Sequence, residues 1–369
     1  CQLLNPTIFS ILLFINEGLT MNEQAFKTTV VGSMPKPDWL MENLPLNTKG
    51  KQVHGKGATW QFEGEALEKA LDDATRLTVH DQVVAGIDII SDGEQRRTSY
   101  LTYITQKLTG FDYDNLAEKW TRNGRRLAEV GRCVGPIKRT NSLLSRDLEF
   151  LKSQTELPVK ITLPGPMTVV DSTYDEHYGD EVSMAMDVAA ALNEEALNLE
   201  KLGASVIQFD EPVFSRYPDK VREWGIEALD RCLLGISKSK TAAHICYSYP
   251  MPGVPRPIVD SYPVILKALE NSKIDELALE FEASKLDPEL LRLCPSKTIM
   301  FGCIDNGTHE IENPTEVAQK LLAAAQHIPA EQIQAAPDCG LLPLPLGIAR
   351  EKLKAMVDGA EQARIALER

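Results

Sequence analysis

The sequence predicts an α/β protein, and within that class a (β/α)8 TIM barrel with long loop insertions. Three observations support this prediction: short apolar runs alternate with longer amphipathic stretches, eight such runs occur, and the chain has 369 residues. Strand–helix alternation is typical of parallel strands, and eight-unit barrels commonly span roughly 200 to over 400 residues. A doubly wound open sheet is the alternative. Its nucleotide-binding form is disfavoured, because no glycine-rich phosphate loop follows the first strand.

The eight predicted strands follow one another along the chain with helical patterns between them. The strands are "KTTVVGSM" (27–34), "IDIISDGE" (87–94), "VKITLPGP" (159–166), "SVIQFDEP" (205–212), "TAAHICYS" (241–248), "ELALEFEAS" (276–284), "TIMFGCID" (298–305) and "IQAAPDCG" (333–340). Amphipathic stretches such as 183–203 and 314–328 indicate the helices. The segment 42–65 and the excursion 112–146 interrupt the alternation. "RCVGPIK" (132–138) could form a ninth strand, and we interpret it as part of that excursion.

The first twenty residues are predicted to be an upstream or non-native extension, and 21–369 a single barrel domain. "IFSILLFI" (8–15) is apolar, but no basic segment precedes it and no small-residue cleavage site follows it. Met21 opens a stretch that resembles a natural start. No apolar run reaches the roughly 18 residues that a membrane helix needs.

Composition narrows the classes of partner and the compartment. The chain is 43% hydrophobic and 25% charged, with a net charge of −14, which disfavours nucleic acid and anionic membranes as partners. The seven cysteines are odd in number and show no disulfide spacing, which favours a reducing cytoplasm. We therefore predict a cytoplasmic protein that binds neither nucleic acid nor membrane.

Seven of the eight predicted strands end in a polar or reactive group, whereas the third ends in "LPGP". In a barrel the carboxyl ends of all strands converge on one mouth, where catalytic residues lie. The groups are Ser33, Glu94, Asp210 with Glu211, His244 with Cys246, Glu280, Asp305 and Cys339. In isolation, Asp210 and Glu94 could equally be helix caps or surface groups, and Ser33 a turn residue.

His244 and Cys246 point to the same face of their strand, because they are two residues apart. Glu280 on the next strand and Cys339 on the last could face them, and histidine, cysteine and carboxylate together suit zinc. The alternative for the His-x-Cys pair is simple core packing, since buried cysteine is common. Cys339 is harder to explain as packing because it lies in the turn "PDCG". The remaining cysteines after the first residue, Cys133, Cys232, Cys294 and Cys303, are interpreted as small buried hydrophobes.

The motifs "VVGSMP", "SDGE", "LPGPMT", "IQFDEP", "HICYS", "LALE" and "PDCGL" occur in that order over about residues 27–362. Together they resemble the catalytic C-terminal half of the cobalamin-independent methionine synthases. The resemblance implies a TIM barrel and a catalytic zinc ion held by His244, Cys246, Glu280 and Cys339. It also implies that homocysteine binds zinc through its sulfur, while Ser33, Glu94 and Asp210 hold its amino acid head.

The sequence departs from the family pattern in ways that concern the methyl donor. The family's methyl-folate stacks on a tryptophan where this sequence has Ser172, and a family histidine after the seventh strand falls near Gly307, with His309 two residues on. Full-length family enzymes also carry a second, N-terminal barrel that this sequence does not contain. The donor thus stays open between methyl-folate and a methyl-corrinoid, the latter on a partner protein or free.

Three alternative functions remain at this stage. A thiol alkyltransferase could act on another thiol such as coenzyme M, although that molecule has no ammonium group for Glu94 and Asp210 to bind. A non-catalytic zinc- or corrinoid-binding barrel would keep the ligands without turnover. A zinc hydrolase ranks low, because two thiolates and a carboxylate make zinc a poor Lewis acid. We expect a zinc-dependent methyltransferase of methionine biosynthesis.

Overall fold

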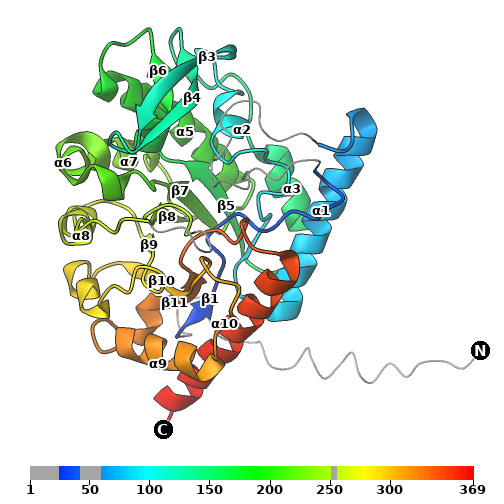
Figure 1. Ribbon diagram of the computed structural model, residues 1–369, viewed down its shortest axis with the longest axis vertical. Helices are drawn as coiled ribbons and strands as arrows, with labels where there is room; N and C mark the ends of the chain where they lie inside the picture. The colour runs from blue at the N-terminus through cyan, green and yellow to red at the C-terminus, as the bar shows by residue number, and fades with distance from the viewer. Residues whose placement is uncertain (1–24, 42–59, 251–255) are drawn as a thin grey trace, which may run out of the picture.

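The computed structural model describes residues 25–41, 60–250 and 256–369. At its centre lies an eight-stranded parallel sheet in the order β1-β11-β10-β9-β8-β7-β5-β2 (Figure 1). Its strands are β1 (Lys27–Thr28), β2 (Ile90–Ser91), β5 (Val159–Pro164), β7 (Val206–Asp210), β8 (Lys240–Ile245), β9 (Glu276–Leu279), β10 (Thr298–Ile304) and β11 (Ile333–Pro337). Each lies within, or within one residue of, one of the eight predicted runs. A parallel bridge between Thr29 and Ile89 joins the two end strands, so the sheet curls into the predicted barrel.

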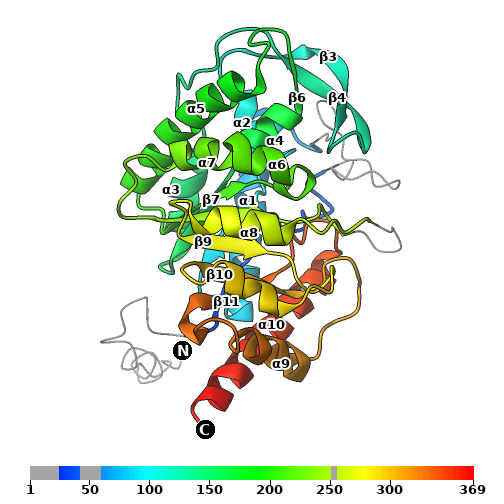
Figure 2. The ribbon, with the colours of Figure 1, turned by 90° about the vertical axis from the view of Figure 1, so that its left-hand side faces the viewer.

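The helices surround the strands and follow them in sequence, as expected for parallel strands joined by right-handed crossovers. They are α1 (Gly64–Ala85), α2 (Thr102–Thr105), α3 (Ser145–Ser153), α4 (Pro166–Asp171), α5 (Glu181–Lys201), α6 (Pro218–Lys220), α7 (Ile226–Cys232), α8 (Tyr262–Glu270), α9 (Pro314–Ala324) and α10 (Leu346–Leu367). Figure 2 shows α5, α7 and α8 over the outer face of the sheet. The two predicted helical stretches correspond to α5 and α9. Within the described ranges, no helix has the length and apolar character needed to cross a membrane.

The barrel interior explains which side chains reach its mouth. Alternate residues of a strand point to the same side. One interior layer is a hydrophobic cluster of six buried side chains: Ile89, Val206, Ala242, Ala278, Met300 and Ala336. Two residues beyond Ala242 lies His244, and two beyond Ala278 lies Glu280. These polar side chains therefore belong to the interior series at the carboxyl ends of their strands.

The excursion between the second and third barrel strands contributes two strands to a separate small sheet, whose third strand follows α4. The antiparallel strands β3 (Phe111–Thr121) and β4 (Arg126–Cys133) form a hairpin, and β6 (Thr173–Asp175) pairs with β4. Only the first two residues of "RCVGPIK" belong to a strand, and β4 pairs outside the barrel. The interpretation of this segment as an excursion from the barrel is confirmed. The hairpin lies at one end of the molecule in Figure 1, beyond the carboxyl end of β7.

Two predictions fall on residues outside those described. They concern the extension at 1–20 and most of the insertion 42–65, of which only residues 60–65 are described.

Glu211, one of the acids at the strand ends, anchors α4 instead of facing the pocket. Its carboxylate is fully buried and accepts hydrogen bonds from the backbone N–H of Met167 (2.8 Å), and from the N–H (2.9 Å) and hydroxyl (2.7 Å) of Thr168. An anion at a helix N-terminus satisfies donors that have no partner within the helix. The preceding Gly165 is required there, because a Cβ would lie 2.2 Å from the Glu211 carboxyl carbon.

We expect Glu211→Ala to lower the free energy of unfolding by at least roughly 2 kcal/mol, since each buried donor left unpaired costs about 1–3 kcal/mol. Urea denaturation of the variant and the parent measures this difference. Glu181→Ala, at an exposed position on α5, is the matched control and should change stability by less than about 0.5 kcal/mol. Equal stability of the Glu211→Ala variant and the parent would contradict the anchoring role.

Candidate active site

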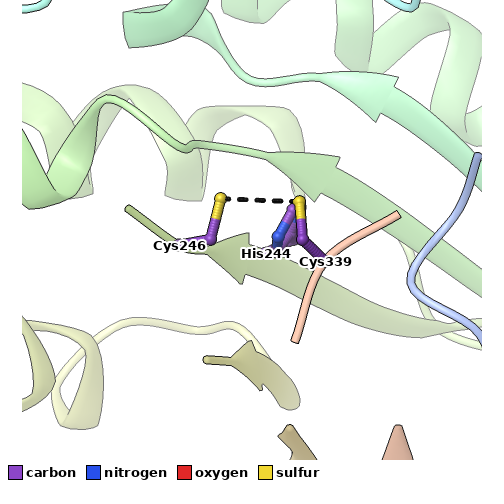
Figure 3. Close-up of side chains that lie close together, drawn as sticks. All are labelled: His244, Cys246 and Cys339. Atoms are coloured by element: carbon purple, nitrogen blue, oxygen red, sulfur yellow. Dashed lines mark hydrogen bonds between the residues drawn. The ribbon is translucent and has the colours of Figure 1, made fainter. Parts of the chain in front are cut away.

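Three of the four predicted metal ligands lie together at the barrel mouth. His244 is on β8, Cys246 follows that strand directly, and Cys339 follows β11. One ligand atom of each lies within 4.8 Å of the other two, and the two sulfurs are 3.8 Å apart (Figure 3). All three side chains are buried. The His-x-Cys spacing on one strand and the distant "PDCG" turn thus meet in space, as the sequence predicted.

The imidazole of His244 is oriented as metal-binding histidines are. Its Nδ1 lies 3.0 Å from Oδ1 of Asp210. Because a carboxylate only accepts hydrogen bonds, Nδ1 carries the proton and donates it, which leaves the lone pair on Nε2. Nε2 is buried and has no hydrogen-bond partner among the described residues. A carboxylate on one ring nitrogen and an unpartnered second nitrogen form the usual arrangement of a metal-ligating histidine.

Electrostatics within the triad favour a thiolate. A hydrogen bond from the Cys339 thiol, followed by the positive charge of His244, holds the pKa of Cys246 well below its usual range. The same sulfur–sulfur hydrogen bond and burial raise the pKa of Cys339. Burial alone would lower the pKa of His244, but the Cys246 thiolate and Asp210 outweigh it and raise that pKa to about 10. A metal ion that binds Nε2 would displace the proton from that nitrogen, because a ligating imidazole is neutral. The thiolate is the form of cysteine that binds metals, so this donor set fits zinc.

Glu280, the fourth predicted ligand, is held elsewhere. Its carboxylate is fully buried at the end of β9 and accepts hydrogen bonds on both oxygens from Arg256, one of them at 2.8 Å, and another from the backbone N–H of Tyr247 at 3.1 Å. Among the described residues, the cluster of potential metal ligands at the barrel mouth consists of His244, Cys246 and Cys339 and does not include Glu280. Glu280 as a metal ligand therefore stays a prediction.

The three predicted substrate-binding residues, Ser33, Glu94 and Asp210, line one pocket. His244, Cys246 and Cys339 line the same pocket. Oγ of Ser33 is 2.7 Å from the hydroxyl of Tyr249, and the Glu94 carboxylate accepts a 2.7 Å hydrogen bond from Thr162. Burial is the largest of the effects that raise the pKa of Glu94.

The backbone near these residues is strained and tightly packed. Glu94 has φ 56°, in the left-handed region that a residue with a side chain rarely adopts. A Cβ on Gly340 would lie 2.1 Å from Oγ of Ser33, and one on Gly32 would lie 3.0 Å from Oε1 of Glu94. Strain of this kind is concentrated at functional sites, and here it fixes where the hydroxyl and the carboxylate point.

The pocket has a second set of lining residues that the sequence did not reveal. They are Tyr100, Tyr249 and the arginines Arg122, Arg125, Arg126, Arg216 and Arg256. They come from loops, from the turn and the first β4 residue of the β3–β4 hairpin, and from a short 3-10 helix, and not from barrel strands. The basic run "RNGRR" (122–126) was the available signal.

The remaining sequence predictions concern residues outside the pocket. Ser172, the position of the family tryptophan, is buried at the end of α4 and is not among the pocket-lining residues. The cysteines interpreted as packing, Cys133, Cys232, Cys294 and Cys303, are all buried with free thiols. Burial raises the pKa of each, which makes them unreactive.

Comparison with known proteins points to one family. Residues 26–362 match the model of the cobalamin-independent synthase catalytic domain. A methionine synthase of Sulfurisphaera tokodaii is 32% identical, covering 91% of this chain and 92% of its own. One from Saccharolobus solfataricus is 30% identical, covering 93% and 96%.

Solved structures agree with these matches. A B12-independent methionine synthase from Shewanella sp. W3-18-1, in complex with selenomethionine, is 37% identical with a TM-score of 0.84, covering 94% of this chain and 99% of that one. A putative vitamin-B12-independent methionine synthase from Listeria monocytogenes, 19% identical with a TM-score of 0.68 over 92% and 99% of the two chains, shares the fold.

Proposed function

Because this chain belongs to the cobalamin-independent methionine synthase family, we propose that it is a zinc-dependent methyltransferase that converts homocysteine to methionine. The observation that carries the proposal is the meeting of His244, Cys246 and Cys339 in the pocket that Glu94 and Asp210 also line. The solved relative from Shewanella, which holds selenomethionine, supports methionine as the product. A zinc ion on this triad, with Glu280 as the proposed fourth ligand, would lower the pKa of a thiol that joins it and keep it as thiolate at neutral pH.

The residues of the chain bind and orient the amino acid head of homocysteine. The carboxylates of Glu94 and Asp210 pair with its ammonium group in charge-assisted hydrogen bonds. The hydroxyl of Ser33 and backbone amides near Gly32 hold its carboxylate. Asp210 also accepts a hydrogen bond from Nδ1 of His244. It therefore links binding of the substrate ammonium group to the orientation of the proposed metal ligand His244.

The reaction is an in-line displacement on the donor methyl. The homocysteine thiol releases its proton to solvent when it binds, and the sulfur electron pair forms the new sulfur–carbon bond. The bond between the methyl carbon and the donor breaks, and its electrons leave with the donor. Tyr247 and Cys246 are almost fully buried, so the pocket floor keeps water away from the reacting sulfur.

One assay tests the proposal. Zinc-loaded protein is incubated with homocysteine and, in separate reactions, with methyl-folate, methylcobalamin, or a cell extract as the methyl source, and methionine is quantified by mass spectrometry. We expect methionine with at least one source, and none when coenzyme M replaces homocysteine. Absence of methionine with every source, from protein that has bound zinc and homocysteine, would favour the non-catalytic alternative.

Asp210→Asn and Glu94→Gln are expected to weaken homocysteine binding while zinc stays bound, because the amide oxygen in Asp210→Asn can still accept the hydrogen bond from Nδ1 of His244. Each loses a charge-assisted hydrogen bond, worth about 1.5–3 kcal/mol, which corresponds to roughly a tenfold to hundredfold higher dissociation constant. Calorimetric titration with homocysteine and elemental analysis of zinc measure the two quantities separately. Asp305→Asn is the matched control, because Asp305 also ends a barrel strand but does not line the pocket. If both variants bind homocysteine with the affinity of the parent, Glu94 and Asp210 do not bind its ammonium group.

A further inference from the structure

The pocket carries a concentration of positive charge that the proposed chemistry of homocysteine leaves unused. Arg122 and Arg125 lie in the turn between β3 and β4, and Arg216 lies in a short 3-10 helix after β7, Phe214–Arg216. All three line the pocket. We call these three residues the arginine wall. It lies on a chain with a net charge of −14, so the overall charge of the protein does not account for it.

Arg122 has unused hydrogen-bonding capacity. Its side chain is only 12% exposed, and its Nε lies 4.0 Å from Oδ2 of Asp171, at the outer limit of an ion pair. Its Nη1 is buried and has no hydrogen-bond partner within 25–41, 60–250 and 256–369. Asp171 is also engaged by the hydroxyl of Tyr217 at 2.6 Å. A buried guanidinium with an unpartnered nitrogen is costly, which a bound anion would relieve.

Arg216 is 7% exposed and yet contacts no carboxylate in the described part of the chain. Its two terminal nitrogens donate to backbone carbonyls, of Pro257 at 3.1 Å and of Tyr247 at 2.8 Å. Burial first, and then the positive charge of Arg125, lower the pKa of the Arg216 guanidinium. The two carbonyls position the Arg216 guanidinium without neutralising its charge, and the positively charged Arg125 lies near it.

The acids of the pocket are engaged with other groups. Asp210 receives hydrogen bonds from His244 and from Gln208, and Glu94 receives one from Thr162. Among the residues that the structure describes, Asp171 is the one carboxylate within 4.0 Å of these three guanidinium groups, so the positive charge of the wall exceeds the negative charge in contact with it. Guanidinium groups pair with carboxylate or phosphate oxygens through parallel hydrogen bonds. A carboxylate or phosphate group of a ligand would therefore complement the arginine wall.

We propose that Arg122, Arg125 and Arg216 form an anion-binding subsite for the second substrate, so that the methyl donor carries a phosphate or carboxylate group that docks on the arginine wall. Assigning the anion to the donor rests on the proposed function, in which Ser33, Glu94 and Asp210 already bind both charged groups of homocysteine. Anion binding itself is independent of turnover. The donor would thus be held at one end by the wall while its methyl group faces the homocysteine sulfur.

Inorganic pyrophosphate is the probe for the subsite. Calorimetric titration of zinc-loaded protein, with homocysteine present, is expected to show one pyrophosphate site that weakens with added salt. Arg125→Glu reverses an exposed charge at the hairpin turn with little risk to folding, and should weaken pyrophosphate at least tenfold. Arg122→Gln should weaken it as well. Arg132→Glu is the matched control on the same hairpin, because Arg132 pairs with Glu176 and does not line the pocket.

Binding of paired donors distinguishes the source of the anion. If it is the phosphate of a corrinoid, methylcobalamin should bind more tightly than methylcobinamide, which lacks the nucleotide phosphate, and Arg125→Glu should abolish the difference. If it is a carboxylate, methyl-folate with three glutamates should bind more tightly than with one, again only in the parent. The proposal is overturned if pyrophosphate binds the parent and Arg125→Glu equally or binds neither, or if Arg125→Glu weakens homocysteine as much as pyrophosphate. Failure of every methyl source in the methionine assay would leave these titrations interpretable.

Discussion

Cys246→Ala and Cys339→Ala are each expected to purify with almost no zinc and to form no methionine above background. Each change removes one thiolate from a buried three-residue group whose ligand atoms lie within 4.8 Å of one another. Loss of a hydrogen-bond partner outside the ligand set already costs about tenfold to a hundredfold in metal affinity, so loss of a ligand should cost more. Elemental analysis of freshly purified protein, with a chromogenic chelator titration for affinity, measures the effect.

Cys303→Ala and Cys133→Ala are the matched controls for this loss. Both residues are buried free cysteines, and Cys303 donates only a weak hydrogen bond, at 3.5 Å, to the backbone of Ala336. Each substitution removes a thiol of similar burial while leaving the triad intact, and we expect zinc content to stay near one ion per chain. Zinc-free parent protein, or equal loss of zinc in the controls, would contradict the assignment of the metal centre.

The barrel strands could be predicted because burial on both sides dictates their composition. "SVIQFDEP" and "TAAHICYS" are apolar over a strand's length and then turn polar where the chain leaves the barrel, and that is where β7 and β8 end. The β3–β4 hairpin was not predicted as a sheet. Its strands carry many exposed polar residues, so a period-two apolar pattern is weak there.

The meeting of His244, Cys246 and Cys339 could be predicted because these residues fall at strand ends that a barrel brings together. The environment of Glu280 could not, because Arg256 comes from a loop whose path no local pattern specifies. For the same reason the hydrogen bond between Asp210 and His244 was missed, although the two lie opposite each other on the neighbouring strands β7 and β8. Strand register is a tertiary property that a strand's own sequence does not reveal.

Free methyl-folate is expected to be a poor donor, with turnover near background. The family's stacking tryptophan corresponds to Ser172, which is 5% exposed and absent from the pocket lining, so this position offers no ring to a pterin. Stacking of a base on an aromatic ring is worth about 1–3 kcal/mol in nucleic-acid complexes, and its loss should lower affinity roughly tenfold to a hundredfold.

A methyl-corrinoid, free or delivered by a partner protein, should support faster methionine formation than methyl-folate. The comparison requires one preparation of zinc-loaded protein, whose competence is established by titration with homocysteine before either donor is added. Initial rates of methionine formation are then measured over a range of each donor. Tyr100 and Tyr249 line the pocket and are the rings that could substitute for the missing indole. Steady-state turnover with methyl-folate at about one per second or faster, ordinary for an enzyme, would contradict this prediction, because such a rate requires a productively bound pterin.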